Sequence, residues 1–242
     1  MSNEPIILSM AEVLTRLRTG RVRVHALTSP VAAERTANTL LALGARPSLT
    51  ANREEIAGFV GGCDALLINL GMLDAERRDT APLAAALARQ GGKPFVLDPV
   101  FVDVSGPRRS LAAELVAAGP TVVKLNRAEA ASLLAIPATA VTVVTGAIDT
   151  LSQAGRTLRL ANGHPLAGQV TATGCALGAV IAACLAVEPD AMTATAAALA
   201  LYGIAAERAA EGATGPGSFA VRLIDALATL DPATLAERVR FA

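Results

Sequence analysis

Val170-Thr171-Ala172-Thr173-Gly174-Cys175 is followed directly by the apolar run Ala176-Leu177-Gly178-Ala179-Val180-Ile181-Ala182-Ala183. Small residues that lead straight into an apolar segment predict a tight loop that opens a buried helix. The first N–H groups of such a helix and the positive end of its dipole favour an anion at this junction. The same dipole is expected to lower the pKa of the Cys175 thiol. The alternative for Cys175 is a small buried apolar side chain, the usual role of a free cysteine.

Composition limits the class of protein. The chain has 242 residues, of which 52% are hydrophobic, which predicts one large α/β domain over residues 1–242. Its 21 basic and 21 acidic residues balance, so a nucleic acid or an anionic membrane is not an expected partner. Aromatic residues make up only 2%, which also argues against stacking on bases.

The chain start and the cysteines predict a cytoplasmic protein. Residues 1–5 lack the basic start and apolar core of a signal peptide. The longest apolar run, 174–187, is too short to span a membrane. Cys63, Cys175 and Cys184 do not form a paired framework, which is typical of a reducing compartment.

Short apolar runs alternate with helical patterns along the chain. The runs predict strands buried on both faces, at 22–26, 65–69, 94–98, 121–124 and 141–145. Residues 151–153 and 156–160 predict an antiparallel hairpin at an edge. The alternation predicts a three-layer α/β fold, with a mostly parallel central sheet and helices on both faces.

Several helix ends can be predicted from capping residues. Ser9 and Glu12 have the spacing of a capping box, which predicts a helix that starts at Ser9 and stops at Gly20. Further helices are expected over 31–43 and from Asp74 to Gln90. After Thr173 the chain is expected to be almost wholly helical, with Pro216 and Pro232 as first helical residues.

Polar residues follow the predicted strands, at the sheet edge where α/β proteins bind ligands. Asn126 and Glu129 have the spacing of a helix cap, and their oxygens also suit a magnesium and phosphate site. Asp98 either bonds neighbouring backbone amides or contributes to a metal network. Thr145-Gly146 is either a turn that ends a strand or a contact for a nucleotide phosphate. His25 and His164 are too few for a zinc site, and His25 is expected to shape a strand end.

Nine segments in a fixed order carry a family resemblance. They are 24–28, 36–45, 67–73, 96–100, 126–129, 143–146, 162–164, 173–175 and 215–219, and the most specific are Thr36-Ala37-Asn38, Thr173-Gly174-Cys175 and Gly215-Pro216-Gly217-Ser218-Phe219. The set resembles the hydroxyethylthiazole kinase family of the ribokinase-like superfamily. The resemblance implies phosphorylation of the primary alcohol of 4-methyl-5-(2-hydroxyethyl)thiazole by ATP with Mg²⁺. It also implies a homotrimer that shares its substrate sites between subunits.

The resemblance assigns roles to residues of this chain. It implies that Cys175 is a weak general base beside Gly174, which suits a loose phosphoryl transfer in which the alcohol proton leaves late. The residues implied to face ATP are Lys124, Thr145, Gly146, Thr173 and Gly215, where Gly215 otherwise belongs to a structural loop. Those implied to organise the metal are Asn126, Glu129 and Asp98. Those implied to contact the alcohol are His25, Ser29, Asn38, Leu49 and Ala172.

This chain departs from the family pattern at several positions. Ser29 and Glu34 stand where relatives usually have asparagine, Leu49 where they have methionine, and Lys124 where they have arginine. Ala172 replaces a glycine, and residues 101–104 replace a glycine-rich turn. The departures leave open a kinase for another small primary alcohol, or a ligand-binding homologue with little turnover. A dinucleotide oxidoreductase is disfavoured because no Gly-x-Gly-x-x-Gly follows an early strand.

Overall fold

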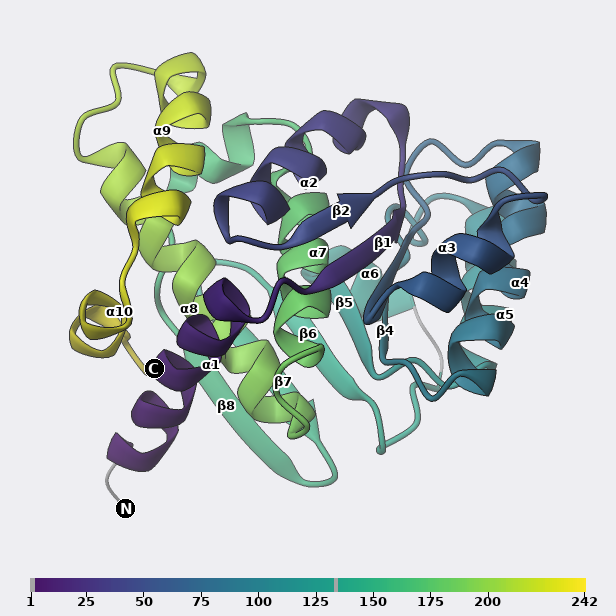
Figure 1. Ribbon diagram of the computed structural model, residues 1–242, viewed down its shortest axis with the longest axis horizontal. Coiled ribbons are helices and arrows are strands. Elements are labelled where there is room, and N and C mark those ends of the chain that lie inside the picture. The colour runs from purple at the N-terminus through teal and green to yellow at the C-terminus, as the bar shows by residue number, and fades with distance from the viewer. Residues whose placement is uncertain (1–2, 133–134) are drawn as a thin grey trace.

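A computed structural model describes residues 3–132 and 135–242, whose strands form one sheet (Figure 1). The strands are β1 Arg23–Leu27, β2 Arg46–Ser48, β3 Ala65–Asn69, β4 Phe95–Asp98, β5 Val122–Asn126, β6 Val141–Thr145, β7 Asp149–Gln153 and β8 Arg156–Leu160. Their order is β2-β1-β3-β4-β5-β6-β7-β8. The pairs from β2 to β6 are parallel, and β7 and β8 add antiparallel strands at one edge.

Helices cover both faces of this sheet. They are α1 Glu4–Thr19, α2 Pro30–Ala42, α3 Ile56–Gly62, α4 Ala75–Gln90, α5 Gly106–Ala117, α6 Arg127–Ser132, α7 Thr173–Leu185, α8 Ala191–Ala210, α9 Pro216–Thr229 and α10 Pro232–Arg238, with a 3-10 helix η1 over Pro165–Gln169. Figure 1 shows α3, α4 and α5 grouped together, apart from α8, α9 and α10. No helix in the described part of the chain is both long and apolar enough to cross a membrane.

Two apolar clusters separate the layers, as the alternation of side chains along a strand requires. In β3, Leu67 belongs to the cluster that contains α1, α7 and α8, whereas Leu66 and Ile68 belong to the cluster of α3, α4 and α5. The three-layer, mostly parallel fold predicted from the sequence is therefore confirmed.

The helix α7 passes through the larger cluster and is buried on all sides after its first turn. Every residue of α7 except Gly174 and Cys175 is buried, because its sequence is apolar around the whole helix. Only its first turn reaches the carboxyl edge of the sheet. The predicted passage from a small-residue loop into a buried helix is confirmed.

Two local predictions differ from the structure. The predicted capping box at Ser9 is wrong, because α1 begins at Glu4 with Pro5 in its first turn. Ser9 lies inside the helix, where its Oγ donates to the Pro5 carbonyl oxygen at 3.0 Å. The strand β2 was not predicted, since Arg46-Pro47-Ser48 is short and not apolar, as an edge strand can be.

Other predicted ends agree with the structure within one or two residues. Asp74 caps α4 by accepting a hydrogen bond from the Arg77 N–H at 2.8 Å. Pro216 and Pro232 are the first residues of α9 and α10. The hairpin of β7 and β8 is present, and the three cysteines are unpaired as predicted.

Candidate active site

A cavity of about 550 Å³ lies at the carboxyl edge of β6, between the β6–β7 turn, the segment 162–168 and the first turn of α7. Four of the predicted site residues line it together: Thr145, Gly146, Thr173 and Gly174. Leu177 from α7 and Leu199 and Tyr202 from α8 form part of its apolar wall. This mixture of a polar turn, a helix start and apolar side chains is typical of a small-molecule site.

The start of α7 is shaped by Ala172 and Thr173. Ala172 adopts the left-handed conformation with φ 66° and ψ 6°, which turns the chain sharply into the helix. The Thr173 hydroxyl donates to the Ala167 carbonyl at 2.8 Å and lies 3.1 Å from the Val170 carbonyl, so the loop is tied to η1. A Cβ added at Gly174 would lie 3.9 Å from Lys124 Nζ. The Lys124 ammonium therefore lies close to the backbone at the helix start.

Lys124 is part of a buried polar cluster at the ends of β3, β4 and β5. Its Nζ lies 3.1 Å from Asp98 Oδ1, and Asn69 Nδ2 donates to Asp98 Oδ2 at 2.7 Å. Burial lowers the pKa of Lys124, but Asp98 and then Cys175 outweigh that effect, so the pKa is raised and the ammonium keeps its charge. Burial acts on Asp98 in the other direction and raises the pKa of that carboxyl despite Lys124.

Asn69 was not among the predicted site residues. It faces Asp98 in the register of β3 and β4, and its Oδ1 accepts a hydrogen bond from the Gly71 N–H at 3.0 Å. Two signals in the sequence pointed to it, its position at the end of a buried strand and its place in segment 67–73 of the family resemblance. Strand pairing, which fixes the contact with Asp98, cannot be read from the sequence.

The pKa of the Cys175 thiol corrects the sequence-based expectation. Burial and, after it, the Asp98 carboxylate raise it to about 11, because Lys124 and Asn69 only partly oppose them. The expected lowering by the helix dipole is wrong, because loss of water around the thiol has the larger effect. Cys175 is therefore a neutral thiol at pH 7.

Asn126 and Glu129 form the reciprocal cap that their spacing predicts. The Asn126 N–H donates to Glu129 Oε2 at 2.8 Å, and the Glu129 N–H donates to Asn126 Oδ1 at 2.9 Å. The other Glu129 oxygen accepts from the Phe101 N–H at 2.9 Å. Glu129 is buried, so the cap places a carboxylate beside the cluster of Lys124 and Asp98.

The loop after β4 takes a conformation that glycine would favour, although it contains none. Val100 has φ 27° and Phe101 has φ 60°. The Arg108 guanidinium donates to the Val100 carbonyl at 3.0 Å and lies 5.7 Å from the centre of the Phe101 ring. Together with the Glu129 bond to Phe101, these contacts hold residues 100–101 in a strained turn.

The other predicted site residues do not line the described cavity. His25 is buried, with Nδ1 2.8 Å from Ser48 Oγ and Nε2 3.1 Å from the Thr50 carbonyl. Ser29 caps α2 by accepting from the Ala32 N–H at 3.3 Å. Asn38 is exposed on α2, Leu49 packs against the larger apolar cluster, and Gly215 precedes α9.

Comparison with known proteins identifies the family. A sequence profile of the hydroxyethylthiazole kinase family matches residues 14–140 and 129–233. The chain belongs to the hydroxyethylthiazole kinase family. It is 46% identical over 226 residues to a probable hydroxyethylthiazole kinase of Agrobacterium fabrum, covering 93% of this chain and 92% of the relative. It is 41% identical to a hydroxyethylthiazole kinase of Granulibacter bethesdensis, covering 95% and 93%.

Solved structures agree with this membership. A hydroxyethylthiazole kinase protein from Pyrococcus horikoshii superposes with a TM-score of 0.92 at 37% identity, covering 96% of this chain and 98% of the other. A ribokinase-like superfamily protein from Enterococcus faecalis gives a TM-score of 0.58 at 18% identity, covering 92% and 82%, which supports the fold alone. The predicted family and the predicted ribokinase-like fold are both confirmed.

Proposed function

We propose that this chain transfers the γ-phosphoryl group of ATP to the primary alcohol of 4-methyl-5-(2-hydroxyethyl)thiazole. The observation that carries the proposal is the start of α7, where Thr173 and Gly174 line the cavity and Cys175 follows them, beside the buried Lys124–Asp98 pair. This arrangement joins a helix N-terminus, a fixed cation and a thiol at one place, within a chain of the hydroxyethylthiazole kinase family.

The nucleotide is proposed to occupy the cavity. Thr145, Gly146, Thr173 and Gly174 line it, and backbone N–H groups at the start of α7 suit phosphate oxygens. The Lys124 ammonium would neutralise charge on the transferred phosphoryl group. Gly215, in the loop before α9, is proposed to lie toward the nucleotide as well.

The residues present fit a magnesium ion that arrives with the nucleotide phosphates. In the described ranges 3–132 and 135–242, no three His, Cys, Asp or Glu side chains gather closely enough to hold a metal by themselves. Mg²⁺ usually keeps several waters and takes one or two carboxylates together with substrate phosphates. Asp98, Glu129 and Asn126 supply such oxygens. Each of these side-chain oxygens contacts one protein donor or cation and keeps a lone pair that could face the metal. The ion would neutralise charge on the phosphates.

Cys175 is proposed to accept the proton of the substrate alcohol. The alcohol oxygen forms a bond to the γ-phosphorus as the bond from that phosphorus to the ADP oxygen breaks, and the proton leaves late. Because the pKa of Cys175 is raised to about 11, only a small fraction of the protein carries the thiolate at neutral pH. A loose transition state tolerates such a weakly populated base.

The alcohol is proposed to contact Ala172, Ser29, His25, Asn38 and Leu49, in a homotrimer that shares its substrate sites. Asn38 is exposed and Leu49 is only partly buried. Residues that a neighbouring subunit covers in a trimer would have such exposure in the single chain. We also propose that residues 1–242 form one domain, since one sheet contains all the described strands. A cytoplasmic location is proposed from the cysteine content.

The test is release of ADP from ATP and Mg²⁺ with the thiazole alcohol, beside a control without alcohol and a panel of other small primary alcohols. The expected result is turnover that depends on the thiazole alcohol and exceeds that with the other alcohols. Turnover with another alcohol alone would assign a different substrate. Binding without turnover would assign a ligand-binding homologue.

A further inference from the structure

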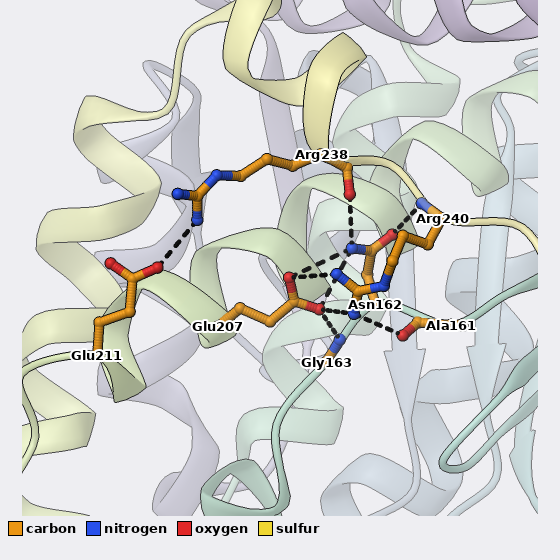
Figure 2. Close-up of polar contacts among 7 residues, drawn as sticks. All are labelled: Ala161, Asn162, Gly163, Glu207, Glu211, Arg238 and Arg240. Atoms are coloured by element: carbon orange, nitrogen blue, oxygen red, sulfur yellow. Dashed lines mark hydrogen bonds and ion pairs between the residues drawn. The ribbon is translucent and has the colours of Figure 1, made fainter.

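The polar network of Figure 2 joins the C-terminal tail of the chain to one wall of the cavity. After α10, Phe241 pairs with Leu160 at the end of β8. The Ala161 N–H donates to the Arg240 carbonyl at 2.9 Å, and the Ala242 N–H donates to the Arg159 carbonyl at 3.0 Å. The tail therefore lies along β8 immediately before the chain enters the cavity wall at Asn162 and Gly163.

Glu207, near the end of α8, is the centre of this network. Its Oε1 accepts from the Gly163 N–H at 2.8 Å and from Arg240 Nη2 at 2.6 Å. Its Oε2 accepts from Arg240 Nη1 at 3.1 Å, so the guanidinium binds the carboxylate with both nitrogens. Such charge-assisted pairs are stronger than neutral hydrogen bonds and fix geometry more narrowly. The Glu207 side chain is only 16% exposed.

Asn162 is held by the same groups. Its Nδ2 lies 3.2 Å from Glu207 Oε1 and 3.0 Å from the Arg238 carbonyl, and its Oδ1 accepts from the Arg240 N–H at 2.8 Å. Asn162 is 5% exposed and lines the cavity together with Gly163. Gly163 has φ 144°, a conformation that a side chain would oppose, so the direction of its N–H depends on glycine.

The cavity wall that starts at Asn162 is anchored at both ends. At its far end, the Thr173 hydroxyl donates to the Ala167 carbonyl. At its near end, Glu207 and the Arg240 N–H bind the wall directly, and the Arg240 guanidinium acts through Glu207. A second ion pair, between Glu211 at the end of α8 and Arg238 at the end of α10, is exposed. In Figure 2 its two side chains make no contact with the wall, which Arg238 meets only through its backbone carbonyl.

We propose that Glu207 and Arg240 are positioning residues for the nucleotide, acting through Asn162 and Gly163. The inference rests on the proposed function, in which this cavity holds ATP. The network fixes the wall in the position that the nucleotide requires, and without it the wall is free to move away. Its loss therefore weakens the binding of ATP and leaves the chemistry at Cys175 unchanged.

The experiment compares two pairs of variants in steady-state kinetics with ATP, Mg²⁺ and the thiazole alcohol. Glu207→Gln and Arg240→Ala are expected to raise the KM for ATP about fivefold or more, with kcat and the KM for the alcohol within about twofold of the parent. The matched controls Glu211→Gln and Arg238→Ala make the same charge changes in the exposed pair, and are expected to change none of these constants. Arg240→Lys keeps the positive charge but cannot bind the Glu207 carboxylate with two nitrogens. It is expected to raise the KM for ATP less than Arg240→Ala does.

Each outcome decides between the two proposals. If Glu207→Gln and Arg240→Ala match their controls while the parent is active, the positioning role is overturned and the proposed function stands. A parent that shows no turnover overturns the proposed function and this inference with it. Because Arg240 is half exposed, Arg240→Ala is expected to fold, and thermal unfolding verifies this. A fall in kcat equal to the rise in KM would also overturn the positioning role.

Discussion

The Nζ atom of Lys124 lies 3.1 Å from Oδ1 of Asp98, and both side chains are almost completely buried. The pair connects β5 to β4 directly below the start of α7, and a Cβ placed at Gly178 would lie 3.8 Å from Asp98 Oδ2. A buried pair of this kind is costly to break, because the remaining charge has no water around it. The pair therefore has a structural role in addition to its place beside the proposed phosphate site.

Replacing one partner of this pair is expected to cost more stability than replacing both. Lys124→Met leaves the Asp98 carboxylate without its cation and is expected to lower the free energy of unfolding by about 3 kcal/mol. The double variant Lys124→Met, Asp98→Asn removes both charges and is expected to recover part of this loss. Urea unfolding of Lys124→Met, of Asp98→Asn and of the double variant measures the coupling energy between the two side chains. Additive losses would show that the two side chains do not interact.

Substitution of Cys175 tests its role as the base. Cys175→Ser is expected to lower kcat and leave the affinity for ATP nearly intact, because serine is a much weaker base at this position. Cys175→Asp supplies a carboxylate that is ionised at neutral pH and is expected to retain or raise activity. Steady-state kinetics and ATP titration measure the two effects separately. If both variants behave like the parent, Cys175 is a buried apolar residue without a catalytic role.

The same residue predicts a dependence of the rate on pH. The pKa of Cys175 is raised to about 11, so the thiolate fraction grows as the pH rises and stays far from saturation at pH 9. We expect kcat to increase between pH 7 and 9 in the parent. In Cys175→Asp the base is already ionised in this window, so kcat should be flat. A flat profile in the parent would show that the thiolate is not the acceptor of the proton.

The sequence predicts the parallel sheet and the residues at its edge, because both depend on local patterns. Short apolar runs mark buried strands, and small residues before Ala176 mark the start of α7. The reciprocal cap of Asn126 and Glu129 follows from their spacing alone. What the sequence cannot supply is the pairing of strands, which brings Asn69 to Asp98, and the tail, which brings Arg240 to Glu207.

The pKa of Cys175 shows why local reasoning failed at one point. The helix dipole acts along the chain and can be inferred from the loop sequence. Burial of the thiol depends on the neighbouring elements, and it raises the pKa more than nearby groups lower it. The same limit applies to Ser9, whose spacing to Glu12 fits a cap although the helix starts five residues earlier.

Ala172 predicts a stabilising substitution at the start of α7. Its φ of 66° lies in the left-handed region, which costs an alanine roughly 1–2 kcal/mol and a glycine almost nothing. Ala172→Gly is expected to raise the free energy of unfolding by about 0.5–1 kcal/mol, after the greater entropy of glycine in the unfolded chain is subtracted. Ala186→Gly at the other end of α7 is the control, because φ there is −70° and glycine should lower stability. Urea unfolding of both variants should give opposite signs.

Gly203 allows α8 to lie against the cavity wall, and its replacement tests that contact. A Cβ at this position would lie 2.7 Å from the Asn162 carbonyl oxygen, a backbone atom that cannot rotate away. Gly203→Ala is therefore expected to push Asn162 outward, to lower stability by roughly 1–3 kcal/mol and to raise the KM for ATP more than the KM for the alcohol. Gly58→Ala in α3, where no atom lies within 4 Å of the new Cβ, is the control and should be neutral or slightly stabilising. Equal stability of the two variants would show that the cavity wall moves aside for the methyl group. The close approach of α8 to Asn162 would then have no part in shaping the cavity.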